Sequence, residues 1–411
     1  MDDVQRADAH PHGSPTSAWL TFALAFADST RLCRHIRNAR PEPAAVGALI
    51  QRYLDRQDDE LHQVLAPLVG TAQMAELFSD ATARRRDQAL AWQAAEPNRH
   101  LLGMDHPAYP TLLQDTQDAP VLLYARGSLD ALVYPLLAIV GSRKASRTAL
   151  AHTREWSTTL ASAGLGIVSG LALGIDAEAH EGALAAVAPA HGPTIAIAAT
   201  PADRIYPTCH AHLAQRIIDN SGLILTEYAL GTATRPWFFP QRNRIISGIS
   251  LGVLVTQAAL PSGTLTTATH AIDQGRDVMA VPGCVTDLQF RGCHALIKQG
   301  AALVEDARDV YDALGDPLQR ALGRLRPHHE LLAVPGQAPG HVSTQCVLAL
   351  DDAELTRQER ELLDTLTVRP ATLDELMSQD GPGIAQLAAQ LGMLEARGLI
   401  VFTTGGRYTR C

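Results

Sequence analysis

Short apolar runs alternate with alanine-rich, helix-like stretches through the middle of this 411-residue chain. The apolar runs occupy residues 136–141, 166–170, 194–199, 223–228, 252–257 and 278–283. Strands that are apolar at nearly every position are buried on both faces, which is typical of a parallel sheet covered by helices. The pattern therefore predicts an α/β fold, built on a Rossmann-like, doubly wound and mostly parallel sheet.

The segments on either side of this domain follow a helical period. Residues 17–27 and 44–56 have apolar positions spaced as in amphipathic helices, and three helical patterns precede a hairpin-like sequence at 399–410. Three helices followed by a hairpin is the element order of a winged helix. We therefore expect a helical N-terminal domain (15–95), the sheet domain (100–315), a linker rich in Pro, Gly and His (316–354) and a winged helix (355–411).

The third helix of the expected winged helix, residues 383–397, carries only Glu395 and Arg397 as charges. A helix that reads duplex DNA needs cations to neutralise phosphates. We therefore favour a protein contact or a purely structural role for this domain, and duplex binding is the alternative. The N-terminal helices carry no chemistry on their faces, so a structural or interaction role is expected for them too.

Composition narrows the class of protein. The chain is 46% hydrophobic and 19% charged, and its polar N-terminus is unlike a secretory signal. It also lacks an apolar run of about 18 residues, the length of a membrane span. These features predict a cytoplasmic protein that does not enter a membrane. The cysteines are scattered without a C-x-x-C pair, so we expect reduced thiols and no metal site.

The charge of the chain is unevenly distributed. A net charge of −9 argues against indiscriminate binding to nucleic acid. Residues 141–300, however, contain 12 Lys and Arg against 10 Asp and Glu, whereas the remaining residues contain 22 against 33. The sheet domain is therefore the relatively basic part of an acidic protein, which is compatible with a local anion site.

Ligands of a doubly wound sheet bind beyond the carboxyl ends of its strands. After the first predicted strand, Gly141, Ser142 and Arg143 combine a permissive backbone, a hydroxyl and a cation at the start of a helix, which suits an anion. A tight turn with a solvated arginine is the alternative. The turn is not G-x-G-x-x-G, and no acidic residue ends the second strand, which argues against a dinucleotide. No cofactor is expected.

Two further turns add polar groups to the same edge. The turn after the second strand contains Gly170, followed by Asp176 and His180 one helical turn apart; we favour capping and packing for this pair, because no nucleophile accompanies it. Gly263 and Thr264 lie in a hydroxyl-rich turn that opens a helix, another anion-accepting geometry. A later basic segment supplies Arg291, His294 and Lys298. A plain helix start or a solvated face is the alternative for each.

The stretch WFFPQRNRIISG (237–248) combines aromatic rings with arginines directly before an apolar segment. Because proline is excluded from a helix interior, we expect Phe239 to precede the helix. Arg242, Asn243 and Arg244 would then lie in its first turn, where cations are disfavoured unless an anion is bound. Aromatic faces beside arginines form a platform for unpaired bases. The alternative is phenylalanine packed in the core with solvated arginines.

Nine motifs follow one another between residues 105 and 310: HPAYPTLLQ, VLLYARG, AIVGSRKAS, SGLALGIDAEAH, RIYP, FPQRNRIISGIS, SGTLTTA, VPG and RGCHALIKQGA. As an ordered set they closely resemble the DNA-processing protein A (DprA/Smf) family of bacterial single-stranded-DNA-binding proteins. The resemblance implies a non-catalytic protein, usually a homodimer. Such proteins protect DNA taken up in natural transformation and help load the recombinase RecA onto it.

The resemblance also implies roles for matching residues. Those expected to face DNA are Arg143, Phe239, Arg242, Asn243 and Arg244. Those expected to line the same groove are Gly141, Ser142, Gly170, Gly263 and Thr264, and Lys298 completes the expected DNA-binding set. Leu173 stands where relatives commonly have a basic residue, and Arg204 is the candidate to compensate. The N-terminal segment lacks the Gly-x-Gly hairpin often found in the family, so DNA binding is not expected there.

One enzyme class has a similar pattern. Nucleotide phosphoribohydrolases of the lysine-decarboxylase-like group resemble this chain in the first turn and in a later Gly/Thr-rich turn. They need P-G-G-x-G-T-x-x-E, with a glutamate that acts on the ribose, whereas PSGTLTTATH (261–270) has no glutamate after SGT. A scaffold that binds only proteins would leave the aromatic and arginine residues of 237–248 unexplained. Single-stranded-DNA binding is therefore the leading hypothesis.

Overall fold

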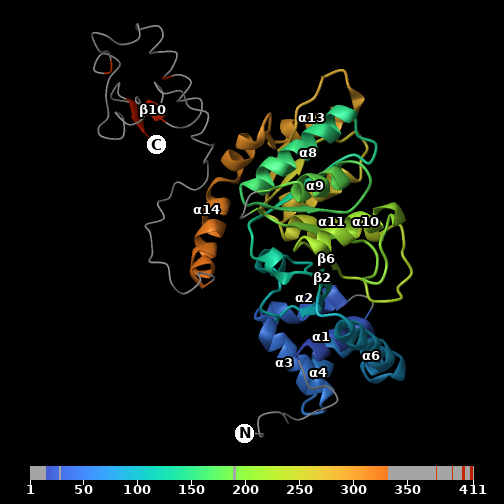
Figure 1. Cartoon of the computed structure of the whole chain (residues 1–411). Helices are drawn as coiled ribbons and strands as arrows, with labels where there is room; N and C mark the ends of the chain where they lie inside the picture. Colours follow the sequence, from blue (N-terminus) through green and yellow to red (C-terminus); the bar gives the residue numbers. More distant parts are fainter. Residues whose placement is uncertain are drawn as a thin grey trace. The chain divides into compact units, whose positions relative to one another are not determined.

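The computed structural model describes residues 15–26, 29–187, 191–331, 376, 391, 400–402 and 408–410. The chain divides into two compact units, Met1–Pro335 and Gly336–Cys411, and each is described by itself (Figure 1). The boundary between the units lies inside the segment predicted as a linker. Within the described residues, no helix is both long and apolar enough to cross a membrane.

A nine-stranded sheet forms the centre of the first unit. Its strands are β1 (Arg99–Gly103), β2 (Leu122–Gly127), β3 (Leu136–Val140), β4 (Gly166–Ser169), β5 (Thr194–Ile197), β6 (Leu223–Thr226), β7 (Gly252–Val255), β8 (Asp277–Ala280) and β9 (Ala302–Leu303). Their order is β1-β2-β6-β5-β4-β3-β7-β8-β9, and all neighbours from β6 to β9 are parallel. The predicted α/β fold with a mostly parallel sheet is confirmed.

Each of the six predicted strands is present as one of β3 to β8, and each ends one to three residues before its apolar run does. The remaining apolar residues leave the sheet and begin the loops at its carboxyl edge, the side where these parallel strands end. The opposite side is the amino edge. Strands β1 and β2 were not predicted; they are antiparallel and extend the sheet beyond β6. Strand β1 begins with Arg99 and His100, so it lacks the continuous apolar run that marked the other strands.

Alternate residues of the strands point into two apolar layers. One layer contains Leu137, Ile139 and Ile167, and it is covered by α8 (Arg147–Ser162), α9 (Ile175–Leu184), α10 (Ala211–Asp219) and α14 (Ala307–Leu331). The other contains Ala138, Val140 and Val168, and it is covered by α11 (Phe238–Gly248), α12 (Thr264–Asp273) and α13 (Arg291–Lys298). Helices on both faces make the sheet doubly wound.

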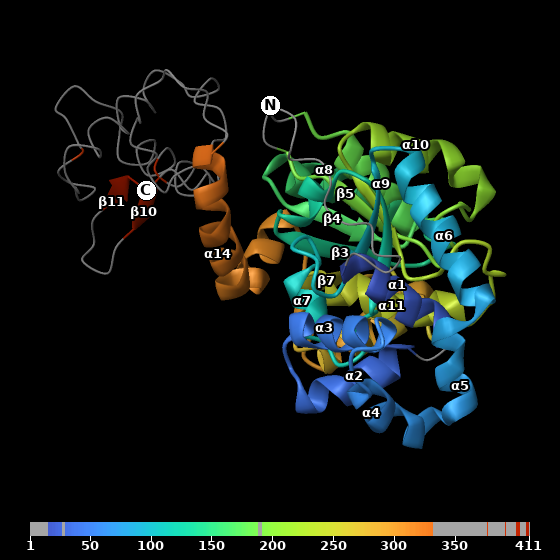
Figure 2. The same ribbon diagram turned by 90° about the horizontal axis from the view of Figure 1, so that it is seen from below.

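The N-terminal helices pack beside the added strands. They are α1 (Pro15–Ala25), α2 (Ser29–Ala39), α3 (Pro43–Leu54), α4 (Glu60–Val69), α5 (Thr71–Ala75) and α6 (Asp80–Ala95), and the short α7 (Thr111–Gln114) follows β1. Figures 1 and 2 show α1 to α6 gathered at one end of the unit, next to β2. Helix α1 was predicted to be amphipathic but is buried on nearly all sides. Its Trp19 ring lies over Gly103 of β1, where a Cβ would approach Cδ1 of the ring to 2.6 Å.

The C-terminal part differs from the prediction at one point. Residues 316–331, expected to be an irregular linker, continue α14 beyond a break at Gly315 (φ 30°, ψ −118°). Leu318 is buried in the same apolar layer as Leu314, which explains why the chain stays on the sheet domain here. In the second unit, β10 (Ile400–Phe402) pairs antiparallel with β11 (Tyr408–Arg410), so the predicted hairpin is confirmed. The three helices predicted before it lie almost entirely outside the described residues.

Candidate nucleic-acid interface

Strand order reverses between β3 and β7, and the loops that follow these two strands bond directly to each other. The Ser142 amide donates to the Gln257 carbonyl (2.8 Å), and the Ser146 amide donates to the Gln257 side-chain oxygen (2.8 Å). The Thr264 hydroxyl donates to the Gly141 carbonyl (3.0 Å). These contacts occupy the crevice in which a doubly wound sheet holds a nucleotide.

The glycines of this edge serve close packing. A Cβ on Gly141 would lie 2.5 Å from Ile175, and one on Gly174, whose φ is +81°, would lie 2.3 Å from the Ser142 carbonyl oxygen. A Cβ on Gly170 would lie 2.6 Å from the Arg242 guanidinium. Gly141 and Gly170 were expected to line a groove, and in this structure protein atoms fill the space beside them.

Helix α11 begins earlier than predicted. Trp237 is its N-cap and Pro240 is its third residue, a position where the missing N–H would have no intrahelical partner. Proline is therefore tolerated inside the first turn, and the expectation that Phe239 precedes the helix is wrong. Moreover, the Phe238 amide donates to the Arg235 carbonyl (3.0 Å) and the Phe239 amide to Pro236 (3.4 Å). Because these amides are already bonded, anion binding at this helix N-terminus loses its basis.

Arg242 lies in the second turn of α11 and is only 3% exposed. Its Nη1 donates to the carbonyls of Gly170 (2.7 Å) and Ile197, the residues at the ends of β4 and β5. Burial lowers the pKa of Arg242 to about 10, and the nearby Asp176 carboxylate opposes that shift. Asp176 itself accepts the Gly170 amide (3.1 Å). Arg242 thus joins the helix to the ends of two strands.

Arg244 is also buried and forms a bidentate ion pair with Glu227, with Nη1–Oε1 at 2.6 Å and Nη2–Oε2 at 2.7 Å. Its Nε donates to the Asp118 carbonyl (3.1 Å). Burial alone lowers the pKa of Arg244, but the charge and hydrogen bonds of Glu227 outweigh it and the net shift is upward. Since both arginines are bonded to protein groups, neither guanidinium is available to a phosphate in this structure.

An exposed cluster lies just outside these arginines. The Phe239 ring is half-buried and packs against Tyr206 in a T-shaped arrangement, with the centroids 5.4 Å apart. Cζ of Arg143 lies 5.6 Å from the Phe239 centroid. Within the described part of the chain, the Arg143 side chain has no hydrogen-bond or ion-pair partner. We call Arg143, Tyr206 and Phe239 the aromatic cluster. It joins the loops after β3 and β5 to the start of α11.

The neighbouring rings differ in exposure. Phe238 stacks on Tyr228 with centroids 4.0 Å apart, and the Tyr228 hydroxyl donates to the Phe238 carbonyl (3.1 Å). Trp237 is 54% exposed, and Cζ of Arg235 lies 5.0 Å from its ring. Phe238 therefore belongs to the packed side of the helix and Trp237 to the solvent side.

Asn243 connects α11 to the hydroxyl-rich turn. Its Nδ2 donates to the Thr266 hydroxyl (2.8 Å) and to the Gly263 carbonyl (3.4 Å). The Thr264 amide donates to the Ser262 hydroxyl (3.2 Å), and the Ser142 hydroxyl likewise accepts the Lys144 amide (3.1 Å). These polar groups thus hold the loops of the carboxyl edge in place beside the aromatic cluster. Gly263 is exposed, with open space where a Cβ would point.

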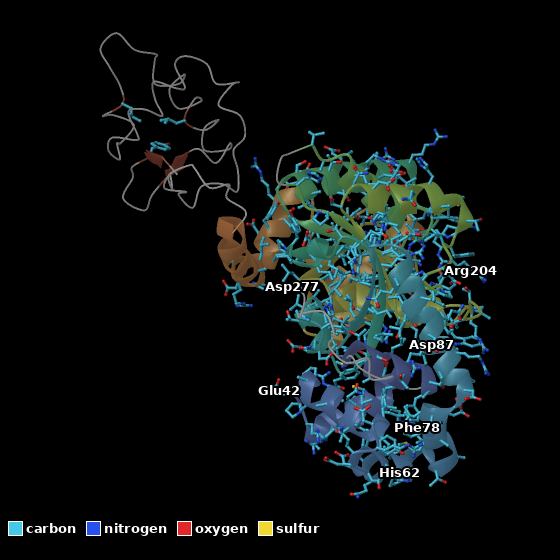
Figure 3. All side chains as sticks on the ribbon, turned by 60° about the horizontal axis from the view of Figure 1, so that its bottom comes forward. Glu42, His62, Phe78, Asp87, Arg204 and Asp277 are labelled. Atoms are coloured by element: carbon cyan, nitrogen blue, oxygen red, sulfur yellow. The ribbon has the colours of Figure 1, made fainter. Side chains whose placement is uncertain are left out.

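Lys298 lies away from this cluster. It is the last residue of α13, which starts at the carboxyl edge, where the Gly292 amide donates to the Ala258 carbonyl (2.7 Å), and returns toward the start of β9. The helix of a parallel crossover runs opposite to its strands, so Lys298 lies toward the amino edge. Of the two cations of α13, Arg291, its first residue, is the one that lies at the carboxyl edge. Figure 3 labels one residue near each edge, Arg204 and Asp277, and they lie on opposite sides.

The prediction gave no role to Tyr206 or to Trp237. Tyr206 belongs to RIYP, a motif recognised only by its resemblance to the family, and it is 53% exposed in the loop after β5. The signal that could have found it is its position just beyond the carboxyl end of a predicted strand. Leu173, at the position where relatives carry a cation, is also exposed, and Arg204 is exposed two residues before Tyr206.

Asp176 and His180 have structural contacts. His180 is fully buried, and its Nδ1 lies 2.7 Å from the Thr194 hydroxyl. Burial, with smaller contributions from His210 and Arg242, lowers the pKa of His180 to about 3. Burial raises the pKa of Asp176, which accepts backbone amides. The predicted packing of this pair agrees with these contacts, whereas the predicted helix cap is wrong: the N-cap of α9 is Gly174, and no side chain caps it. Among the described residues, no three or more His, Cys, Asp or Glu are grouped to hold a metal ion.

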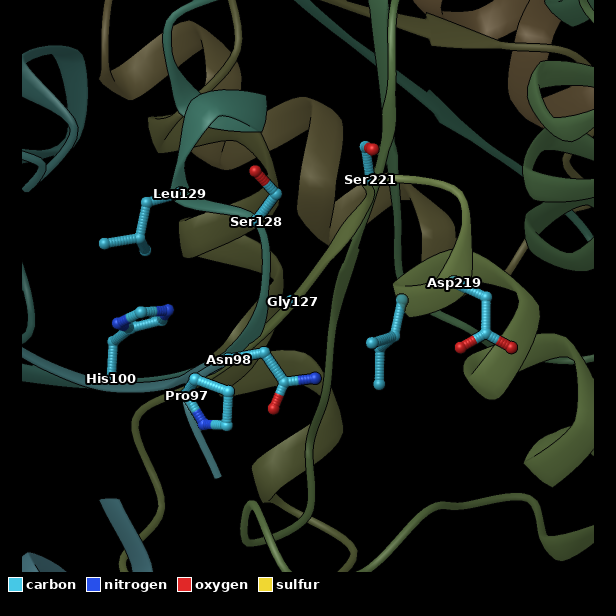
Figure 4. A pocket seen from close by; sticks show the side chains of 9 residues that line it. Pro97, Asn98, His100, Gly127, Ser128, Leu129, Asp219 and Ser221 are labelled. Atoms are coloured by element: carbon cyan, nitrogen blue, oxygen red, sulfur yellow. The ribbon is translucent and has the colours of Figure 1, made fainter. Parts of the chain in front are cut away.

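A shallow depression of about 450 Å³ lies near the amino edge (Figure 4). Its lining includes His100, Gly127, Ser128, Asp219 and Ser221, close to the start of β6. Among the described residues that line it there is one carboxylate and no lysine or arginine. This depression is therefore unsuited to phosphate and separate from the aromatic cluster.

Comparisons with known proteins agree on one family. Residues 100–315 match the family model for DNA recombination-mediator protein A, and residues 349–406 match the DprA winged helix domain. The chain is 34% identical over 336 residues to protein Smf of Escherichia coli K12, covering 82% of this chain and 84% of that protein. It is 44% identical over 202 residues to DNA processing protein DprA of Streptococcus pneumoniae, covering 49% and 70%.

A solved structure gives the same result. The X-ray structure of DNA processing protein A from Streptococcus pneumoniae superposes with a TM-score of 0.60 and 31% sequence identity. The superposition covers 73% of this chain and 97% of the Streptococcus pneumoniae chain. The agreement of sequence and fold over this length identifies the family, and the second family match assigns a winged helix to the C-terminal part.

Proposed function

Because this chain belongs to the DNA-processing protein A (DprA/Smf) family, we propose that it binds single-stranded DNA at the carboxyl edge of its sheet. The observation that carries the proposal is the aromatic cluster, in which Arg143 lies over the Phe239 ring and Tyr206 packs against that ring at a steep angle. The proposal does not require the buried Arg242 or Arg244 to contact DNA.

The chemistry of the cluster suits unpaired nucleotides. Base faces are accessible in single strands and hidden in a duplex, so exposed aromatic rings favour the single strand. Arg143 is exposed and, in the described part of the chain, without a hydrogen-bonded or ionic partner, so its guanidinium is available to a phosphate. In this proposal Phe239 and Tyr206 stack on bases and Arg143 neutralises the backbone.

The other expected site residues support these three. Ser142, Gly263 and Thr264 hold the neighbouring turns, and Asn243 joins α11 to one of them. Arg242 and Arg244 act as positioning residues that fix α11 to the sheet. Gly141 and Gly170 permit the close packing that this requires.

The proposed function is non-catalytic and uses no cofactor. A phosphoribohydrolase needs a carboxylate free to act on a ribose, yet PSGTLTTATH offers none and Glu227 is held by Arg244. Asp176 is buried and accepts backbone amides. These observations favour binding over hydrolysis. From the family resemblance we further propose a cytoplasmic homodimer that protects incoming single-stranded DNA and loads RecA during natural transformation.

A direct test is titration of a labelled oligo-dT and the matching duplex with the full chain at two salt concentrations. We expect preference for the single strand. The slope of log affinity against log salt should be negative on the single strand, with about −0.7 from each phosphate contact, that of Arg143 included. Equal affinity for the two forms would contradict the proposal. Release of free base from nucleoside monophosphates would favour the enzyme instead.

The finer parts of the proposal need separate measurements. Light scattering on the purified chain tests the dimer, which should have twice the mass of the chain. RecA filament assembly on DNA covered by a single-strand-binding protein tests loading, and the full chain should shorten its lag. A monomer, or an unchanged lag, would remove that part of the proposal and leave DNA binding standing.

A further inference from the structure

The loop that leads into α11 carries an exposed ring and a cation that the aromatic cluster does not use. Trp237 is 54% exposed, and Arg235 is exposed beside it. We propose that Trp237 and Arg235 form a second base-stacking position for single-stranded DNA, adjoining the one at Phe239. This inference rests on the proposed function and extends its site by at least one nucleotide.

The start of the helix places the two rings apart. Successive helical residues are about 100° apart around the axis, so Trp237 and Phe239 point to roughly opposite sides of the first turn. Trp237 already has helical dihedral angles (φ −75°, ψ −10°). Phe238, between them, is held against Tyr228. A strand that crosses this helix end would therefore meet the exposed Trp237 ring on one side and the half-buried Phe239 ring on the other.

The same pair of groups occurs twice at this edge. Cζ of Arg143 lies 5.6 Å from the centroid of Phe239, and Cζ of Arg235 lies 5.0 Å from Trp237. Like Arg143, the Arg235 side chain has no hydrogen-bond or ion-pair partner in the described part of the chain. Each pair offers a ring for a base and a guanidinium for a phosphate. Two such units match two nucleotide positions of one strand.

The second unit is held in place before any ligand binds. The Arg235 carbonyl accepts the Phe238 amide (3.0 Å), which ties the loop to the first turn of the helix. Pro236 restricts the backbone between Arg235 and Trp237. A ring that is already ordered loses little conformational entropy on binding. An exposed yet restrained tryptophan therefore suits stacking better than a mobile one would.

The charge around Trp237 favours a polyanion over a protein partner. Residues 228–241 contain a single charged side chain, Arg235, and it is a cation. The flanking acidic residue, Glu227, is neutralised by Arg244 in the interior. Arg235, Pro236 and Gln241, the neighbours of Trp237 in the chain, are all exposed, and none of them is acidic.

Tryptophan fluorescence provides the test. Trp19 is fully buried and Trp92 and Trp156 are half-buried, so Trp237 is the exposed reporter. Oligo-dT should quench the emission of the full chain as a base stacks on the indole. W237F should abolish that quenching and keep the affinity, measured by anisotropy of labelled oligo-dT, within about twofold, because phenylalanine still stacks. The matched control, W156F, should retain the quenching.

Two further variants separate the roles of ring and cation. W237A should weaken oligo-dT binding about five- to tenfold with an unchanged salt slope, since stacking releases no counterions. R235A should reduce the magnitude of the salt slope by about 0.7, because one phosphate contact is lost. The inference is overturned, with the proposed function intact, if oligo-dT binds but W237F quenches as the unsubstituted chain does and W237A binds equally well. It is also overturned if W237A alters self-association and not DNA affinity. Failure of the unsubstituted chain to bind oligo-dT would remove both proposals.

Discussion

The arginines beside the first turn of α11 and the arginines within its second turn have opposite surroundings. Residues 237–240 present Trp237 and Phe239 toward solvent, next to Arg235 and Arg143. Residues 242–246 turn inward, and both of their arginines are buried against strand ends, carbonyls and carboxylates. Cations of the same chemical type therefore have two different environments within one short segment.

An arginine is therefore available to DNA only if its side chain is exposed and its guanidinium is not already bonded to protein groups. A guanidinium inside a protein must be bonded on site, because an unpaired buried charge is costly. Arg244 meets that requirement through Glu227. Arg242 meets it at Nη1, through the carbonyls of Gly170 and Ile197, whereas its buried Nε has no hydrogen-bond partner in the described part of the chain. Their removal should disturb the fold, whereas removal of an exposed arginine should disturb binding alone.

The largest expected effect is on stability. Arg244→Ala leaves the partly buried Glu227 without its partner and should lower the free energy of unfolding by about 3 kcal/mol. Urea denaturation of the full chain measures it. Arg143→Ala is the matched control and should leave stability unchanged, and Arg244→Lys should fall between them if the alanine variant does not fold. An Arg244→Ala variant of full stability that has lost DNA binding would place this arginine in the DNA contact instead.

The next effect concerns the outward ring. Phe239→Ala should weaken oligo-dT binding by about 1–3 kcal/mol, the contribution of one stacked base, without changing the salt slope. Fluorescence anisotropy at two salt concentrations measures both quantities. Phe239→Tyr keeps an aromatic face and should bind nearly as the unsubstituted chain does. Equal loss in both variants would indicate that the ring serves packing and not stacking.

A third prediction concerns pH and the buried side of the domain. The pKa of His180 is about 3 in the folded chain, and 6.5 is its ordinary value. Between these values the unfolded chain takes up a proton that the folded chain does not, so stability is retained above pH 6.5 and falls as pH decreases. The loss should be about 1.4 kcal/mol per pH unit.

Comparison with a variant isolates this histidine. His180→Gln should flatten the decline in unfolding free energy between pH 6.5 and pH 5. Asp176, whose pKa is raised, acts in the opposite sense at lower pH, and it is common to both proteins. Identical pH profiles for the two chains would mean that His180 is not held neutral by burial.

The smallest effect separates the two edges of the sheet. Arg143→Ala should reduce the magnitude of the salt slope by about 0.7, the value for one phosphate contact on a single strand. Lys298→Ala removes an exposed cation toward the amino edge and should leave the slope unchanged. An equal change in both variants would mean that DNA also follows the amino edge, contrary to the position of Lys298 in α13.

Much of the fold was predictable because buried strands impose a pattern. Strands β3 to β8 are apolar at nearly every position, and this marked the carboxyl edge where the candidate loops lie. Strand β1 was not predictable in this way, since it begins with Arg99 and His100 and pairs at the edge of the sheet. The start of α11 was predicted too late because of Pro240. Proline is excluded from a helix interior, but it is tolerated in the first turn, where Pro240 lies.

The site was predictable in its location and not in its exact partners. Glu227, which engages Arg244, and the Gly170 and Ile197 carbonyls, which engage Arg242, are distant along the sequence or at the ends of other strands. No local pattern reveals such contacts, so these arginines looked available. Lys298 was misplaced for a related reason, because sequence order does not tell which end of a helix faces the candidate edge. Roles for Arg143, Phe239 and Asn243 in DNA binding stay predictions.

Photochemical cross-linking directly tests whether single-stranded DNA binds at the carboxyl edge of the sheet. Oligo-dT carrying 5-iodouracil is bound to the full chain and irradiated, and the attached peptides are identified by mass spectrometry. We predict attachment to the rings at the carboxyl edge, Phe239, Tyr206 and Trp237. Attachment confined to the winged-helix residues 349–406, or to peptides of the amino edge around Lys298, would contradict it.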